Sequence, residues 1–327
     1  MPVRRPLTGA AAALAVLTLA ACGSGGAAPA AAPADDGTLT VVASTNVYGS
    51  IAEAVGGDLV TVESLISDPA ADPHSYESTP ADAAAVAEAD LVIHNGGGYD
   101  EFMPQLLESA GGEPTVLEVA ALSGLVPEGE EEAHTEEEPH AEGEEHAHGE
   151  FNEHFWYSLP TVRTLATDLA EALGAADPAN AATYTANAEA FSVEVDGLIS
   201  QVRAAGASVP GGQVALTEPL PGYLVEEAGL TDVTPPEFSE AVEEDTDPAP
   251  AVVADVLALF GPGGTSLRAL IVNAQTETPT TEQVRAAAQG VGVPVVEMTE
   301  TLPEGQPSYT AWMGAQVEAL TAALNPV

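Results

Sequence analysis

Four residues with metal-binding side chains lie where an α/β protein places its ligands. His74, Glu218 and Glu300 each follow a stretch predicted to form a β-strand, and His154 precedes a predicted helix near position 160. In an open α/β sheet, ligands bind beyond the carboxyl ends of the strands. Two imidazoles and two carboxylates form a plausible shell for a borderline divalent cation. His74, His154, Glu218 and Glu300 are therefore candidate ligands of one metal ion.

Each of these residues is a weak signal when it is taken alone. A single histidine near a helix start is more often a cap or a core residue, and a glutamate after a strand is more often solvated. His94 illustrates the difficulty, because it also ends a predicted strand, at residues 91–93. Spacing alone does not exclude His94 as a ligand.

A tract at residues 128–150 consists almost entirely of Glu, His, Ala and Gly. Such a composition cannot bury a core, so we predict a solvated acidic loop that does not fold on its own. Its histidines would also serve as weak, exchangeable ligands that recruit divalent cations. These histidines are His134, His140, His146 and His148.

The charge of the chain excludes several partners. The formal net charge is -45, from 51 acidic residues against six Arg and no Lys. A chain of this charge does not bind the phosphate backbone of nucleic acids. An anionic membrane surface would also repel it, so membrane residence requires an inserted or covalent anchor.

The first residues are typical of a lipoprotein leader. Arg4 and Arg5 precede an apolar stretch at 10–21, which resembles a secretory signal and is too short to span a bilayer. The stretch ends in Leu-Ala-Ala-Cys-Gly, which resembles the bacterial lipobox, and Cys22 is the only cysteine. We expect a signal peptide at 1–21, lipidation of Cys22, and a tether at 22–37. A plain cleavable signal with an incidental cysteine is the alternative.

The remaining chain alternates predicted strands and helices, which indicates βαβ units and mostly parallel sheets. We predict an N-terminal lobe at 38–176 and a C-terminal lobe at 207–327. Residues 177–206 begin with Asp-Pro and repeat apolar residues at three- and four-residue spacing, which predicts one long helix of roughly 40 Å. The expected fold class is α/β, with two lobes joined by a long rigid helix. The predicted strands lie at 39–43, 59–66, 91–93, 213–217, 270–273 and 294–298, and the predicted helices at 48–55, 80–89, 222–228, 249–260, 281–289 and 309–320.

Two motifs around the histidines resemble those of the zinc/manganese solute-binding proteins of bacterial ABC importers. Residues 72–82 read Asp-Pro-His-Ser-Tyr-Glu-Ser-Thr-Pro-Ala-Asp, which closely matches the motif that carries the family's first histidine ligand. Residues 152–156 read Asn-Glu-His-Phe-Trp and match the second, although the family's Asp-Pro is lost. Residues 95–100 resemble a Gly-rich turn without a ligand, so the resemblance implies a packing or hinge-lining role for His94.

The same resemblance implies the other two ligands. The family's third ligand, His or Glu, precedes a small-residue turn and a Tyr, as Glu218 does here. The fourth is usually Asp and follows the last strand, where this chain has Glu300. The extra methylene makes Glu300 the less certain of the two. The resemblance covers essentially the whole mature chain and implies a protein that moves little when it binds its ion.

The resemblance further implies the function and partners. We expect a monomeric, lipid-anchored, extracytoplasmic protein that captures Zn²⁺, or alternatively Mn²⁺, and delivers it to the permease and ATPase of an ABC importer. The His-rich tract favours zinc and Glu218 favours manganese, and zinc is preferred. A metal-storage or adhesin lipoprotein is an alternative. A zinc hydrolase is another, but the chain contains no H-E-x-x-H or G-x-S-x-G motif, so we predict that the protein is not an enzyme.

Overall fold

The computed structural model describes residues 38–68, 71, 73–126, 151–262 and 266–325. The leader at 1–21, Cys22, the tether and the His-rich tract at 128–150 lie outside these residues. They remain predictions.

The first lobe is a four-stranded parallel sheet in the order β2-β1-β3-β4. Its central strand β1 (Leu39–Thr45) is buried from Val41 onward, as a strand covered by helices on both faces requires. The other strands are β2 (Val60–Ile66), β3 (Leu91–His94) and β4 (Thr115–Glu118), and the helices are α1 (Asn46–Gly56), α2 (Pro80–Glu88), α3 (Phe102–Ala110) and α4 (Val119–Ser123).

The second lobe repeats this arrangement, with a parallel sheet in the order β6-β5-β7-β8. Both sheets therefore have the strand that enters the lobe in an inner position, and the carboxyl ends of the strands form one edge of each sheet. Its strands are β5 (Gln213–Leu216), β6 (Thr231–Asp232), β7 (Leu267–Asn273) and β8 (Val295–Met298), and its helices are α7 (Gly222–Glu227), α8 (Pro236–Glu243), α9 (Pro250–Ala258), α10 (Pro279–Gly290) and α11 (Tyr309–Leu324).

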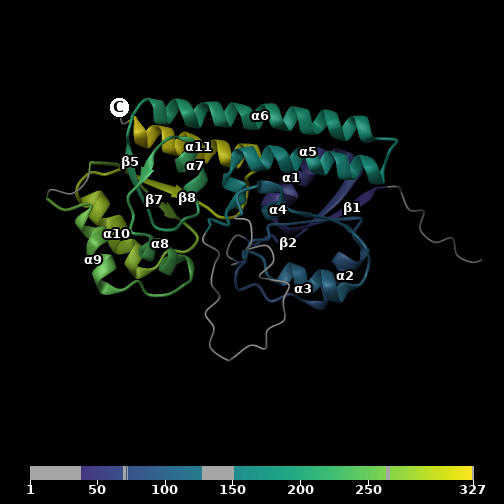
Figure 1. Cartoon of the computed structure of the whole chain (residues 1–327), viewed down its shortest axis with the longest axis horizontal. Helices are drawn as coiled ribbons and strands as arrows, with labels where there is room; N and C mark the ends of the chain where they lie inside the picture. The colour runs from purple at the N-terminus through teal and green to yellow at the C-terminus, as the bar shows by residue number, and fades with distance from the viewer. Residues whose placement is uncertain (1–37, 69–70, 72, 127–150, 263–265, 326–327) are drawn as a thin grey trace, which may run out of the picture. The chain divides into compact units, whose positions relative to one another are not determined.

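A long helix connects the two lobes. Helix α6 (Ala181–Ala207) runs along both of them, beside α5 (Leu159–Ala176) and α11, as Figure 1 shows. All the apolar positions that predicted this helix are buried, and they belong to one apolar cluster that includes strands of both sheets. The lobes therefore share a core. The buried positions of α6 are Tyr184, Ala188, Phe191, Val195, Leu198 and Val202.

Polar contacts also tie the lobes together close to the strand ends. The side chain of Asn46 in the first lobe donates to the carbonyl of Leu302 and accepts from its N–H, at 3.0 and 3.1 Å. The Tyr309 hydroxyl at the start of α11 donates to the carbonyl of Trp156, at 2.7 Å. Paired and buried hydrogen bonds of this kind fix the loop 299–308 against the first lobe.

The predicted fold class is confirmed, because both sheets are parallel, helices flank them and the long helix is present. Threonine caps explain two helix starts: Thr79 and Thr278 each form a capping box ahead of a proline, at α2 and α10. Strands β4 and β6 were not predicted. Both are edge strands with mainly exposed side chains, so they lack the apolar run of a buried strand.

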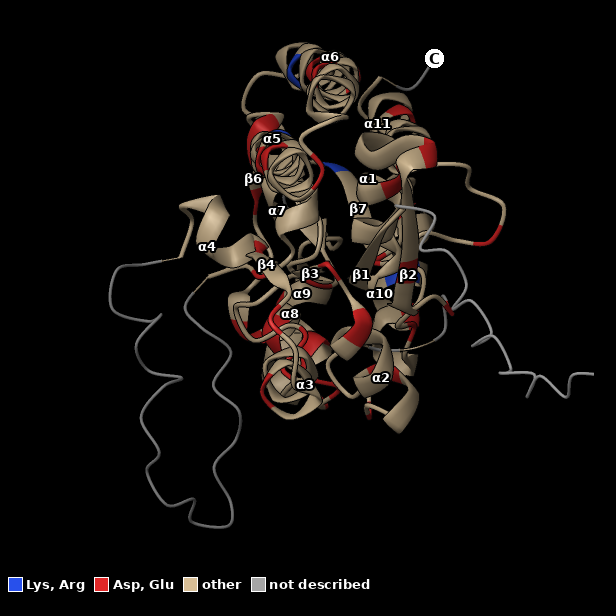
Figure 2. Ribbon diagram, turned by 90° about the vertical axis from the view of Figure 1, so that its right-hand side faces the viewer, with Lys and Arg blue, Asp and Glu red and all other residues tan. Residues whose placement is uncertain are grey.

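Acidic residues are scattered over the helices and loops, with few basic residues between them, as Figure 2 shows. Within the described part of the chain, no helix is sufficiently long and apolar to cross a membrane.

The contact between α6 and α7 generates a test of the shared frame. A Cβ atom added at Gly206 would lie 1.6 Å from the carbonyl oxygen of Ala228, whereas one added at Gly197 would meet no atom within 4 Å. We expect Gly206→Ala to lower the free energy of unfolding by roughly 1–3 kcal/mol, because backbone must move. The control Gly197→Ala, on the exposed side of α6, should raise it by about 0.5–1 kcal/mol. Urea unfolding measures both, and equal effects would contradict the close packing.

Candidate metal centre

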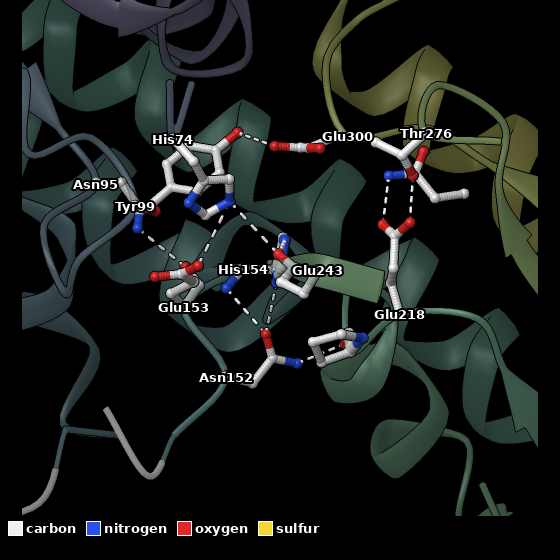
Figure 3. Close-up of polar contacts among 12 residues, drawn as sticks. His74, Asn95, Tyr99, Asn152, Glu153, His154, Glu218, Glu243, Thr276 and Glu300 are labelled. Carbon is white, nitrogen blue, oxygen red and sulfur yellow. Dashed lines mark hydrogen bonds and ion pairs between the residues drawn. The ribbon is translucent and has the colours of Figure 1, made fainter. Parts of the chain in front are cut away.

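The four residues predicted as ligands come from both lobes and lie in the same region (Figure 3). His74 lies in the loop between β2 and α2, and His154 immediately precedes a 3-10 turn (Phe155–Tyr157) that leads into α5. Glu218 follows β5, and Glu300 follows β8. The side chain of His154 is 1% exposed and that of His74 is 19% exposed, so both imidazoles are withdrawn from solvent.

The two imidazoles meet at the carboxylate of Glu243, the last residue of α8. The Oε1 atom of Glu243 lies 3.0 Å from Nε2 of His154 and 3.4 Å from Nε2 of His74. The potential ligand atoms of these three residues all lie within 4.8 Å of one another. His74 and His154 are therefore brought together by the fold, as predicted ligands of one ion must be, whereas Glu243 was not among the predicted residues.

Asn152 orients the imidazole of His154. Its Oδ1 lies 2.8 Å from Nδ1 of His154 and accepts from the backbone N–H of His154 at 3.0 Å. Its Nδ2 donates to the carbonyl of Pro219 in the second lobe at 2.7 Å. An imidazole held through one nitrogen presents the other to a metal, which is the usual arrangement of a histidine ligand. Asn152 thus directs Nε2 of His154 into the site and joins the two lobes there.

Aromatic and acidic neighbours position His74. Its ring packs edge-on against Tyr99, with ring centroids 5.0 Å apart and an interplanar angle of 85°. Its Nε2 lies 3.5 Å from Oε1 of Glu153, the residue before the other histidine. Glu153 is buried as well, so a second carboxylate borders the imidazole pair.

Glu218 and Glu300 are also buried, but their hydrogen bonds go to other residues, and neither belongs to the group of close ligand atoms formed by His74, His154 and Glu243. Glu218 accepts from Nδ2 of Asn273 at 2.7 Å and from the hydroxyl of Thr276. Glu300 accepts from the hydroxyl of Tyr99 at 2.8 Å. Both are in electrostatic range of the cluster, since Glu300 acts on both histidines and on Glu218. Among the described residues, no Arg forms an ion pair with Glu218, Glu243 or Glu300.

The histidines attract protons in this environment. Burial alone lowers the pKa of His74, but the contact with Glu243 and the charges of Glu153 and Glu300 outweigh it and raise the pKa to about 10. Burial likewise lowers the pKa of His154, and the charge and contact of Glu243 outweigh it, so this pKa is raised too. The two imidazoles in turn overcome the effect of burial on Glu243 and hold its pKa well below the usual range.

The other two carboxyls also retain protons more readily than usual. Burial and the charge of Glu243 raise the pKa of Glu218 to about 8, although the hydrogen bonds from Thr276 and Asn273 act in the opposite direction. Burial raises the pKa of Glu300 as well. The raised pKa values favour protonated side chains in the metal-free protein, so a divalent cation that bound here would compete with protons.

His94 contacts a different group of residues. Its Nδ1 lies 3.6 Å from Oδ1 of Asp100. Asp100 accepts from the backbone N–H groups of Asn95 and Gly96 at 2.7 and 2.8 Å, and so closes the Gly-rich turn. These contacts give His94 a packing role next to that turn.

Known proteins resemble this chain in sequence and fold. The family described as "Zinc-uptake complex component A periplasmic" (ZnuA) matches residues 41–323. The iron-binding protein YfeA of Yersinia pestis is 27% identical over 196 residues, 59% of this chain and 58% of that protein. The manganese-binding lipoprotein MntA of Halalkalibacterium halodurans is 26% identical over 221 residues, 67% of each. The chain thus spans only about three-fifths of the length of YfeA.

Solved structures share the fold. A Mn-bound mutant of a periplasmic metal-binding protein from Candidatus Liberibacter asiaticus superposes with a TM-score of 0.68 at 22% identity, covering 88% of this chain and all of that one. The periplasmic zinc-binding protein TroA of Treponema pallidum has a TM-score of 0.66 at 19% identity, covering 88% and 99%. At these identities the likeness establishes the two-lobed fold.

The raised pKa values predict how the metal-free protein responds to alkali. The folded state holds a proton on His74 up to pH of about 10, against about 6.5 in the unfolded chain. This contribution to stability is complete below pH of about 6.5 and disappears as the pH rises through 10. Glu218 acts in the same direction. Its pKa of about 8 in the folded state is above its usual value, so the folded protein loses stability as Glu218 ionises with rising pH. Each proton held only by the folded state gives a slope of about 1.4 kcal/mol per pH unit.

We therefore expect urea unfolding in a chelator to give a lower free energy at pH 9 than at pH 7. His154, whose pKa is also raised, acts in the same direction as His74. His74→Gln should make the decrease in the free energy of unfolding between pH 7 and pH 9 smaller. Stability that stays level or increases over this range would contradict the protonated cluster.

Proposed function

Because this chain belongs to the family of the zinc-uptake complex component A (ZnuA), we propose that it captures a divalent transition-metal ion outside the cytoplasm and delivers it to an ABC importer. The ion is its cargo and lies between the lobes. In this proposal His74 and His154 supply two nitrogen ligands, and Glu218 and Glu300 supply oxygen ligands. Permease and ATPase subunits are the partners. Membership of this family supports binding rather than catalysis.

The observation that carries the proposal is the pair of imidazoles, one buried and one half-buried, whose Nε2 atoms converge on one carboxylate oxygen. Burying several carboxylates without Lys or Arg is unfavourable unless a cation balances them. A divalent ion at this point would accept both imidazole nitrogens and lie beside Glu218 and Glu300. Small movements of these two side chains away from Asn273, Thr276 and Tyr99 would bring their oxygens to the ion.

Zn²⁺ and Mn²⁺ are the two proposed cargoes. Affinity alone does not separate them, because almost any such site binds Zn²⁺ more tightly than Mn²⁺. The names of the relatives given above mention iron, manganese and zinc. The His-rich tract at 128–150 is the feature that favours zinc, and we propose that it recruits ions to the site. The metal whose scarcity raises expression of the gene would identify the physiological cargo.

Anchoring by Cys22 is part of the proposal. A lipidated cysteine would hold the protein at the outer face of the membrane, despite its negative charge. We expect Cys22→Ala to move the protein from the membrane pellet to the medium or soluble fraction, as detected by immunoblotting of the fractions. Retention of this variant in the pellet would contradict the anchor.

Metal binding should stabilise the protein strongly. An ion that binds only the folded state raises the free energy of unfolding by RT ln(1 + [L]/Kd), or about 4 kcal/mol at a thousandfold excess over Kd. We expect Zn²⁺ or Mn²⁺ to raise the melting temperature, and His74→Ala or His154→Ala to remove most of that rise. Glu300→Ala should remove less, because water can replace one carboxylate oxygen.

His94→Asn is the control, since it removes a buried imidazole away from the proposed ligands. It should retain the full metal-induced shift even if the metal-free protein melts lower. Calorimetry of the four variants with and without metal gives the comparison. A double variant, His74→Ala with His154→Ala, that kept the full shift would refute the site.

A further inference from the structure

Glu243 is the acidic residue in the described structure that most directly faces both imidazoles. It ends α8, between β6 and α9 of the second lobe, and its side chain is only 9% exposed. One of its oxygens lies 3.0 Å from Nε2 of His154 and 3.4 Å from Nε2 of His74 (Figure 3). Its other oxygen, Oε2, is buried and has no hydrogen-bond partner among the described residues. This buried oxygen is therefore left without a donor from that part of the chain in the metal-free structure.

The packing of α8 does not require a carboxylate at this position. The helix is attached to the second lobe through Phe238, Ser239 and Val242, which are all buried. Glu240 and Glu244, on the same segment, are exposed to solvent. Glu243 alone turns inward, where a charged group is costly to bury unless it meets a cation or strong donors. Its neighbours are the very nitrogens that a metal would use.

We propose that Glu243 is a further ligand of the transported ion, so that two imidazole nitrogens and carboxylates from Glu218, Glu243 and Glu300 form an oxygen-rich shell that fits Mn²⁺ or Fe²⁺ better than Zn²⁺. This inference rests on the proposed function. Zinc prefers four ligands, and structural zinc sites are almost always four-coordinate. Three carboxylates and two imidazoles exceed that number, and carboxylate ligands suit harder ions such as Mn²⁺.

Glu243 would then reduce the difference by which the site binds Zn²⁺ more tightly than Mn²⁺. Without it, two histidines and two carboxylates could form a four-coordinate zinc site. With it, the site offers at least five donors, which an ion that accepts five or six ligands can use fully. Helix α8 would also give the second lobe a ligand from a helix end, in addition to those from the loops after β5 and β8.

The test compares metal affinities of the full chain and two variants. Glu243→Gln keeps the size of the side chain and removes its charge, and Glu240→Gln is the matched control on the exposed face of α8. Competition titrations would be run separately with Mn²⁺ and Zn²⁺. Even removal of a residue that only supports a ligand typically weakens metal binding 10–100-fold, so we expect loss of the Glu243 carboxylate, a direct ligand in this proposal, to weaken Mn²⁺ binding at least about tenfold. Zn²⁺ binding should change much less, and Glu240→Gln should change neither.

Other outcomes would overturn the inference. If Glu243 only holds the imidazoles of the metal-free protein, Glu243→Gln will leave both affinities unchanged or raise them. If Glu243→Gln weakened Mn²⁺ and Zn²⁺ binding equally, Glu243 would not contribute to the choice between the two metals. Unmodified protein that bound neither metal would instead refute the proposed function itself.

A second measurement does not depend on a variant that folds. X-ray absorption spectroscopy of the unmodified protein loaded with Mn²⁺ counts the nitrogen and oxygen atoms around the ion. We expect five or six, including two imidazoles. A four-coordinate Mn²⁺ ion would overturn the inference.

Discussion

The need to bury several carboxylates with no Lys or Arg beside them governs the structure around the two imidazoles. Glu153, Glu218 and Glu300 are buried, and the carboxylate of Glu243 is nearly so, yet the chain has no Lys, and the described Arg ion pairs involve other carboxylates. In the metal-free protein, the raised pKa values of both imidazoles and of Glu218 and Glu300 favour protonation of these groups, which lowers the net negative charge. A bound divalent cation would balance the same negative charges in place of the protons, so metal binding would be coupled to proton release.

The frame around the cluster limits how the site can move. Helix α6 and the apolar cluster that it shares with both sheets make the lobes one body, and Asn46 and Tyr309 fasten the loop after β8 to the first lobe. The histidines precede α6 in the chain and the glutamates at 218, 243 and 300 follow it. An ion held by both groups would therefore join segments that are far apart in sequence.

The sequence was sufficient for the architecture because its signals are local. Apolar runs predicted the inner strands and also the edge strands β2 and β8, and the Thr-Pro starts of α2 and α10 follow from capping chemistry. Edge strands β4 and β6 were missed because exposed strands have no such run. Motifs named His74 and His154 as candidate ligands, and the structure brings their imidazoles together at Glu243. Glu243 had no comparable signal, because it follows no strand and reaches the imidazoles only through the packing of α8, which the sequence did not predict as a helix.

The most direct measurement is a crystal structure of the protein soaked in Mn²⁺ or Zn²⁺, with anomalous diffraction data collected at the metal edge. We expect one strong anomalous peak between Nε2 of His74 and Nε2 of His154, at about 2.0–2.3 Å from each nitrogen, with the carboxylate of Glu243 beside it. A peak at His94 and Asp100, or the absence of any peak between the two imidazoles at saturating metal, would contradict a metal-carrying site at this position.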